Sequence, residues 1–448
     1  MTGNTAFSFT TDGWTTRAVQ SYMSLTVYYV TTDFELKNFM LSLEHVPEKH
    51  TFKYLQSMIL NCLQSWHFDV TKYAFFTTDN GRNIAKAINT YSNWTRIPCF
   101  GHCLQLAIRS AMRNFTKYTE LRKKCRAIVT FFSKSTTAKE KLVTVQKRIN
   151  NDGTPLQLIQ EVDTRWNSTY EMFARFLRLQ ESLNIILCEE GTPDNLNVEE
   201  WSFLQTVTLV LEPFKDATED LSGELYPTIS TYYPIYFALL HVLEELTGDS
   251  TVLNISNSLR NTLKERFQPI IENNYIYIFR MMLDPRFKDY LLDHAEKHEM
   301  HKMFSDRIAL LENGNTFNRN IWRQQDDNLP SCRTSGTKKS KLLAFFDRTL
   351  GNPEMEVKSF TTRKNQEIRE YFKESIVPRG THIIDWWKQN QARFPILSQA
   401  ARNCLSIPAT QVKSERLFST ARNVVVQSRA RLLPANVQEL CFLHGNLK

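Results

Sequence analysis

Several features that mark other classes of protein are missing from this sequence of 448 residues. Its eight cysteines include no Cys-x-x-Cys pair and lack the dense spacing of a secreted disulfide scaffold, so we expect reduced thiols. The N-terminus has no basic lead followed by an apolar stretch, and no uncharged apolar run is long enough to cross a bilayer. No internal repeat of solenoid period is visible. We therefore expect a soluble, intracellular protein with no membrane partner.

The composition itself is that of an ordinary globular protein. It is 42% hydrophobic and 23% charged, which is sufficient for a large core. The formal net charge is +8, from 55 Lys and Arg against 47 Asp and Glu. This mild excess favours an acidic partner such as nucleic acid but is too diffuse to establish one.

The first part of the chain predicts a mixed sheet. Residues 7–46 predict three strands in an antiparallel meander, because β-branched and aromatic residues alternate there. Helical spacing follows over 51–66, and 73–78 predict a buried strand. The order β-β-β-α-β indicates at least one parallel pairing. The unit is completed by a short helix, a fifth strand and another helix, expected at 83–91, 97–100 and 104–115.

Helical patterns dominate most of the remaining chain. The polar stretch 313–340 predicts a mobile surface loop, and a last helix is opened by Pro434. The chain therefore divides into a first α/β part, a helical insertion and a C-terminal part that returns to the core, with predicted bounds 1–117, 118–393 and 394–448.

Two carboxylates follow predicted strands. Asp12 ends the first strand, and Asp79 ends the buried one. Carboxylates at adjacent strand ends bind hard divalent cations such as Mg²⁺ through oxygen. The competing interpretation is that both are turn residues, since Asp, Asn and Gly are common in turns.

Seven segments occur in the order typical of one family. They are Thr11-Asp-Gly-Trp-Thr15, Thr78-Asp-Asn-Gly-Arg-Asn-Ile84, Cys99-Phe-Gly-His102, Asp163-Thr-Arg-Trp-Asn-Ser-Thr169, Leu283-Asp-Pro-Arg-Phe-Lys288, Ile407-Pro-Ala-Thr410 and Ser414-Glu-Arg-Leu-Phe-Ser419. On these segments the whole chain resembles the hobo/Activator/Tam3 (hAT) transposases, of the type carried by BED zinc-finger proteins. The resemblance implies an RNase H-like mixed sheet interrupted by a large all-α insertion domain, with a C-terminal helical dimerisation region.

The resemblance also implies a catalytic set of Asp12, Asp79 and Glu415. In the family these acids bind two divalent ions, Mg²⁺ or Mn²⁺, for phosphodiester cleavage and strand transfer. Ser414 is a good N-cap, which places Glu415 in the first turn of a predicted helix, where the helix dipole favours an ionised carboxylate. The alternative is an ordinary glutamate at a helix start.

DNA contacts are implied for Arg165, Trp166 and His102. An indole can stack on a base rotated out of the duplex, whereas a core tryptophan is the alternative for Trp166. We expect no zinc site at Cys99 and His102, because four ligands are needed and Cys103 is the only local third. A basic stretch predicts either a phosphate-contacting strip or a solvated helix face. Its members are Lys413, Arg416, Arg422, Arg429 and Arg431.

The last predicted helix has more apolar surface than one narrow stripe. The resemblance implies that this surface supports a homodimer or higher oligomer, and the alternative is packing onto the chain's own core. The candidate dimerisation residues are Val437, Leu440, Phe442 and Leu443.

Two functions from different classes stay open. The first is a nuclear, DNA-binding transposase core with metal-dependent cleavage. The second is a domesticated, non-catalytic nuclear protein of the BED type, acting in DNA binding, dimerisation or transcriptional regulation. Enzyme activity is left open because Lys413 and Arg422 stand where the family commonly has Pro and Gly. The sequence begins close to its first strand and contains no BED finger, so we expect weak site-specific DNA binding.

Overall fold

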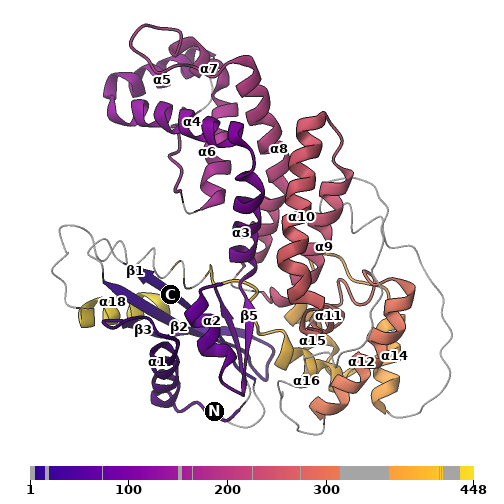
Figure 1. Cartoon of the computed structure of the whole chain (residues 1–448). Helices are drawn as coiled ribbons and strands as arrows, with labels where there is room; N and C mark the ends of the chain where they lie inside the picture. Colours follow the sequence, from indigo (N-terminus) through magenta and orange to yellow (C-terminus); the bar gives the residue numbers. More distant parts are fainter. Residues whose placement is uncertain are drawn as a thin grey trace.

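The computed structural model places a five-stranded sheet beside a large helical region (Figure 1). The described residues are 6–15, 20–72, 74–149, 154–163, 165–223, 226–272, 274–312, 363–412, 414, 416 and 434–447. The predicted loop at 313–340 and the helix expected over 415–426 lie outside this set, apart from residue 416.

The sheet is mixed, with strand order β3-β2-β1-β4-β5. The strands are β1 (Ser8–Thr15), β2 (Ser21–Val30), β3 (Leu36–His45), β4 (Ala74–Thr78) and β5 (Trp94–Pro98). β1, β2 and β3 pair in antiparallel fashion, whereas β4 runs parallel to both β1 and β5. The predicted meander and the predicted parallel pairing are therefore confirmed.

Alternation along the strands gives the sheet two different faces. Phe9 and Phe76 are in register and stack with ring centroids 5.0 Å apart on one face, which α1 (Phe52–Ser65) and α2 (Arg82–Asn89) cover. Thr51 caps α1, since its hydroxyl accepts the Tyr54 N–H at 3.3 Å. The opposite face contacts α3 (Phe100–Met112) and α18 (Pro434–Asn446), so the sheet is buried on both sides.

Helices make up the rest of the described chain, as the sequence predicted. They are α4 (Thr116–Lys134), α5 (Thr136–Ile149), α6 (Trp166–Arg178), α7 (Gln180–Ile186), α8 (Val198–Leu221), the 3-10 turn η1 (Ile229–Thr231), α9 (Tyr232–Glu245), α10 (Ser250–Glu272), α11 (Ile276–Met282), α12 (His294–Glu312), α14 (Arg363–Lys373), α15 (Ile383–Asn390) and α16 (Pro395–Cys404). One apolar core continues from the sheet through these helices. Figure 1 shows α3 leading from the sheet toward α4 and α6. No helix in these described parts is long and apolar enough to span a membrane.

The segment Leu283–Lys288 forms a buried junction after α11. The Asp284 carboxylate accepts hydrogen bonds from Arg286 Nε at 3.0 Å, Arg286 Nη2 at 2.8 Å and Ser230 Oγ at 2.7 Å. Lys288, which is fully buried and has a φ of 50°, donates to the Tyr371 and Glu374 carbonyls at 2.5 and 2.8 Å. These bonds fix the end of α14 against the junction, because the Lys288 ammonium caps carbonyls at the helix C-terminus.

Candidate active site

Asp12 and Asp79 follow equivalent positions on two neighbouring parallel strands. The last registered pair between β1 and β4 joins Thr11 to Thr78, and the two acids are the next residue on each strand. Parallel neighbours lie about 4.8 Å apart. The strand pairing therefore brings these two predicted residues together where β4 ends. The prediction that Asp12 ends its strand is wrong, because β1 stays paired with β2 as far as Thr15.

Both carboxylates are held by backbone N–H groups of nearby glycines. Asp12 Oδ1 accepts from Gly13 at 2.9 Å, and Asp79 Oδ1 accepts from Gly81 at 3.0 Å. A Cβ added to Gly81 would lie 3.0 Å from Asp79 Oδ1, so a glycine suits this close approach. The turn bonding is compatible with a metal-binding role, because a carboxylate oxygen can accept an N–H and still leave lone pairs for a cation.

Arg96 on β5 holds the backbone beside Asp79. Its Nε donates to Thr78 Oγ1 at 2.7 Å, and its Nη2 donates to the Asp79 carbonyl and to Asn80 Oδ1. Burial lowers the Arg96 pKa from its usual value, which Cys103 and then other nearby groups partly oppose. The sequence interpretation missed this residue, and the only available signal was a cation in an otherwise apolar strand.

A distant segment crosses the face of the sheet that carries Asp12. This segment, residues 406–411, forms hydrogen bonds with β1, β4 and the start of α3. The Ser406 carbonyl accepts from Ser8 Oγ at 3.0 Å, and the Pro408 carbonyl accepts from Thr77 Oγ1 at 2.6 Å. The Ala409 carbonyl accepts the Phe100 N–H at 2.9 Å, and Gln411 Nε2 donates to the Thr11 carbonyl. At its end the hydroxyls of Ser414 and Thr10 lie 3.2 Å apart. Thr10 and Asp12 share a sheet face by alternation, so Ser414 lies on the face that carries the acid.

Glu415 lies outside the described residues. Lys413, Arg422, Arg429 and Arg431 do too, so the basic strip stays a prediction, and Arg416 is helical and exposed. Among the residues that are described, no group of three or more His, Cys, Asp and Glu could hold a metal ion. Of the three predicted acids, the described residues therefore include only Asp12 and Asp79.

The Cys-x-x-His segment begins α3. Cys99 is the buried N-cap residue of this helix, Cys103 is buried, and His102 is half-buried. Cys103 Sγ accepts from Asn80 Nδ2 at 3.2 Å, which ties α3 to the turn after Asp79. The prediction for His102 is not tested by these contacts.

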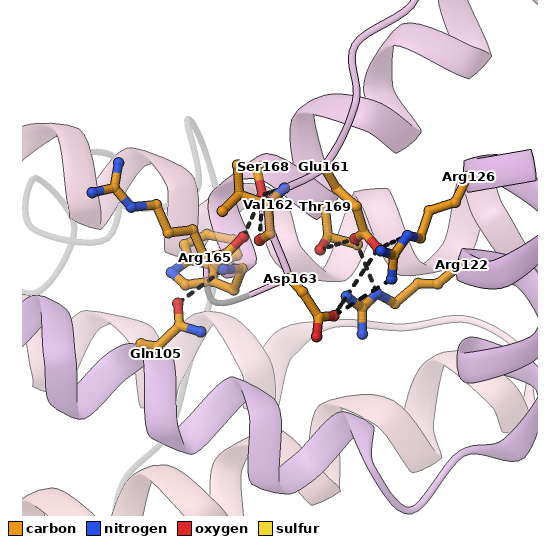
Figure 2. Close-up of polar contacts among 10 residues, drawn as sticks. Gln105, Arg122, Arg126, Glu161, Val162, Asp163, Arg165, Ser168 and Thr169 are labelled. Atoms are coloured by element: carbon orange, nitrogen blue, oxygen red, sulfur yellow. Dashed lines mark hydrogen bonds and ion pairs between the residues drawn. The ribbon is translucent and has the colours of Figure 1, made fainter. Parts of the chain in front are cut away.

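Trp166 opens α6 inside the core. Trp166 is 6% exposed, and its ring packs edge-on against Tyr170 and Phe214, with each ring centroid 6.4 Å from its own. The backbone N–H of Trp166 donates to Gln105 Oε1 at 2.8 Å, and the neighbouring Arg165 is exposed (Figure 2). The core alternative accounts for this packing, and base stacking by Trp166 stays a prediction.

The four candidate dimerisation residues of α18 divide into two pairs. Val437 is buried against β2 and β3, whereas Phe442 is half-buried and stacks on the exposed Trp66 at 6.1 Å, so both side chains contact the chain itself. Leu440 and Leu443 are 44% and 50% exposed. A groove of about 490 Å³ lies between α18 and β3, with Leu443 and Phe442 in its lining.

Asn446 fastens α18 to the edge strand β3. Its side-chain amide accepts the Met40 N–H and donates to the Met40 carbonyl, both at 3.0 Å. Next to it, the Trp66 indole donates to the Leu41 carbonyl at 3.1 Å, at a point where the β2–β3 register shifts. The backbone groups of Met40 and the carbonyl of Leu41 on this edge strand are thus hydrogen-bonded by side chains.

Three family models match the chain, in an order that agrees with this architecture. Residues 10–94 match the ZBED1 RNase-like domain, 97–210 match the ZBED1 RNase-like helical domain, and 367–447 match the hAT family C-terminal dimerisation region. The matches define a protein with an RNase-like sheet domain, a helical domain and a self-association region.

Known relatives align with nearly the whole chain. Zinc finger BED domain-containing protein 4 of Homo sapiens is 24% identical over 98% of this chain and 37% of its own length. The "Putative AC transposase" of Zea mays is 24% identical over 95% of this chain and 55% of its own length. The chain belongs to the family of hAT-type transposases and their BED zinc-finger relatives. It spans less than two thirds of the length of either relative.

Proposed function

We propose that this chain is the core of a nuclear, self-associating, DNA-processing protein of the transposase type. Asp12, Asp79 and Glu415 would bind Mg²⁺ or Mn²⁺ for phosphodiester cleavage and strand transfer. The observation that carries the proposal is the parallel register of β1 and β4, which places Asp12 within β1 level with Asp79, the first residue after β4. Carboxylate oxygens are the donors that these hard cations prefer.

The contacts of Ser414 support the assignment of Glu415. Ser414 directly precedes Glu415 and its hydroxyl lies 3.2 Å from that of Thr10, two residues before Asp12. As the next residue in the chain, Glu415 is the proposed source of the third carboxylate. The donor set of three carboxylates suits two divalent cations.

In this proposal each group has a separate role. The ions would supply an activated oxygen nucleophile and stabilise the leaving oxygen. Asp12 and Asp79 provide ligands on rigid strands, and the N–H groups of Gly13 and Gly81 orient their carboxylates. Arg96 keeps the backbone after β4 in place through Asp79 and Asn80.

DNA and a second copy of the chain are the proposed partners. The match to an hAT dimerisation region supports self-association. Leu440 and Leu443 are the residues of α18 whose exposure suits a contact between copies.

The test is nicking of supercoiled plasmid by the purified chain with Mg²⁺ or Mn²⁺. Asp79→Asn and Glu415→Gln should each lower the rate by on the order of 100-fold or more, since both remove charge that acts on the transition state. Asp33→Asn is the matched control, because Asp33 is an exposed turn acid after β2. Equal rates in all four proteins would refute the three-acid assignment.

The second candidate function is a non-catalytic nuclear DNA-binding or dimerisation module. Arg96 favours it, because its guanidinium, bonded to the Asp79 carbonyl, places a positive charge beside the site where a cation would bind. Folded protein that binds plasmid but does not nick it under any metal condition would support this second function.

A further inference from the structure

Residues 154–163, the described part of the connection between α5 and α6, have no regular secondary structure, yet helices on both sides hold their backbone. Gln146 of α5 donates to the Leu156 carbonyl at 2.9 Å and accepts the Leu156 N–H at 2.8 Å. Arg175 of α6 donates to the Gln157 carbonyl. Residues 154–163 therefore form a fixed connection, of the kind that often presents functional side chains.

Glu161 is the anchor of this connection. Its side chain has no exposed surface and receives Arg122 Nε and Nη2, each at 3.0 Å. Thr169 Oγ1 donates to the same carboxylate at 2.5 Å, and Arg126 Nε lies 3.5 Å away (Figure 2). A buried carboxylate is tolerated only when paired in this way, so α4 and the connection are locked together.

Hydrogen bonds also fix the residues that follow Glu161. Arg122 Nη2 also donates to Asp163 Oδ1 at 2.8 Å, and the Arg165 N–H donates to the Val162 carbonyl at 2.8 Å. Together with the bond from Trp166 to Gln105, these contacts present the exposed Arg165 beside α3.

A second arginine lies on the same side of α3. Arg109 is exposed and stands one helical turn after Gln105, so the two share a helix face. The pKa of Asp163 is lowered, first by the hydrogen bond and charge of Arg122, and to smaller extents by Arg126 and Arg109. Arg109 is thus near Asp163. The two acids here, Glu161 and Asp163, are both paired with Arg122.

We propose that Arg109 contacts the phosphodiester backbone of a DNA strand beside the DNA contact that the family resemblance implies for Arg165, and that the Arg122–Glu161 ion pair positions Arg165 for its contact. The proposal rests on the DNA-processing function proposed above. α3 begins beside Asp79, where Cys103 bonds Asn80. Arg109 lies six residues after Cys103 on α3, which is a rise of about 9 Å, or roughly three phosphate spacings along one strand of a duplex. A DNA strand bound at Arg109 can therefore reach Asp79.

The first experiment measures binding of a fluorescein-labelled DNA duplex by anisotropy in EDTA, so that metal chemistry plays no part. Arg109→Ala and Arg165→Ala should each weaken binding roughly fivefold to tenfold near 0.1 M salt and flatten the salt dependence by about one phosphate contact. Arg369→Ala removes the same charge from an exposed position on α14, far from α6 in Figure 1, and should change affinity less than twofold.

The second experiment separates positioning from charge. Glu161→Gln removes a negative charge, so electrostatics alone would tighten DNA binding, whereas positioning predicts weaker binding that approaches the loss in Arg165→Ala, roughly fivefold. Amide exchange over 154–163 should rise in Glu161→Gln and stay unchanged in Arg109→Ala. Thermal melting confirms that each variant is folded.

Two results would overturn this proposal. One is a loss in Arg109→Ala and Arg165→Ala no greater than in Arg369→Ala, and the other is tighter binding by Glu161→Gln. Either result leaves plasmid nicking untouched, whereas loss of nicking with normal binding counts against the catalytic assignment and leaves the phosphate contact standing.

Discussion

Acids of the helical region and acids of the sheet edge are held in different ways. Asp284 and Glu161 are buried, and each receives two nitrogens of one guanidinium. Asp12 and Asp79 are half-buried and accept N–H groups from the glycines that follow them. The difference indicates that the first pair supports the fold, whereas the second pair can be changed with little effect on it.

The largest expected effect is on stability, at Asp284. Asp284→Asn leaves Arg286 beside a neutral amide in the interior and should lower the free energy of unfolding by about 3–5 kcal/mol. Asp79→Asn keeps an oxygen for the Gly81 N–H and should cost less than about 0.5 kcal/mol. Urea unfolding measures both, and equal losses would remove the distinction between the two regions.

The next effect tests the buried cation of the helical region through pH. Burial lowers the pKa of Lys288 from its usual 10.5 to about 8, against the opposing charges of Glu374 and Asp289. Between these values the unfolded chain binds the proton and the folded chain does not, so stability should rise with pH. The difference in unfolding free energy between the wild type and Lys288→Met should shift in favour of the wild type by roughly 1 kcal/mol per pH unit above pH 8.

A pH-independent difference between these two proteins would contradict a buried, titrating amine. Measuring the difference against Lys288→Met is necessary, because buried tyrosines such as Tyr371, whose pKa is raised by burial, act with the opposite sign at high pH.

A smaller effect is expected at Thr169. Thr169→Val keeps the shape but removes the hydroxyl that donates to Glu161, and should cost about 1–2 kcal/mol in urea unfolding. A neutral result would mean that the Arg122 pairing alone satisfies the carboxylate.

The smallest effect on stability is predicted at the sheet edge. In Gly81→Ala the new Cβ would meet Asp79 Oδ1 at 3.0 Å and Ile84 Cγ2 at 3.3 Å, so the carboxylate has to shift by a few tenths of an ångström. Unfolding should change by less than about 0.5 kcal/mol. The plasmid-nicking rate should fall by roughly tenfold, because the metal ligand moves; an unchanged rate would argue against Asp79 as a ligand.

Periodicity predicted much of the sheet unit because local patterns determine each element there. The first four strands and the helix over 51–66 followed from alternation and helical spacing, and Pro434 marked the start of α18, whereas the fifth strand lies at Trp94–Pro98 rather than at 97–100. α3 begins at Phe100 rather than at residue 104, because the Phe100 N–H is satisfied by the distant Ala409 carbonyl. Such tertiary contacts leave no signal in a local window.

The candidate site was predictable to a similar degree. The parallel pairing of the two strands could be predicted, so Asp12 and Asp79 could be placed together from sequence, but the extension of β1 past Asp12 to Thr15 could not. The pairing of Arg122 with Glu161, 39 residues apart, could not be, since it depends on how α4 packs against a connection without periodicity. The same holds for Ser414 and Thr10, which are 404 residues apart.

The two hydrogen bonds between the Asn446 side chain and the Met40 backbone have a consequence for folding during synthesis. The two residues are 406 positions apart, and a ribosome adds about 5–20 residues per second. Roughly 20–80 s therefore pass between the synthesis of β3 and that of Asn446, which bonds Met40 on that strand. An uncovered edge strand is a template for pairing with other chains. The nascent protein therefore passes through a period of aggregation risk that ends only when α18 docks, and its yield in cells should depend on chaperones that bind during synthesis.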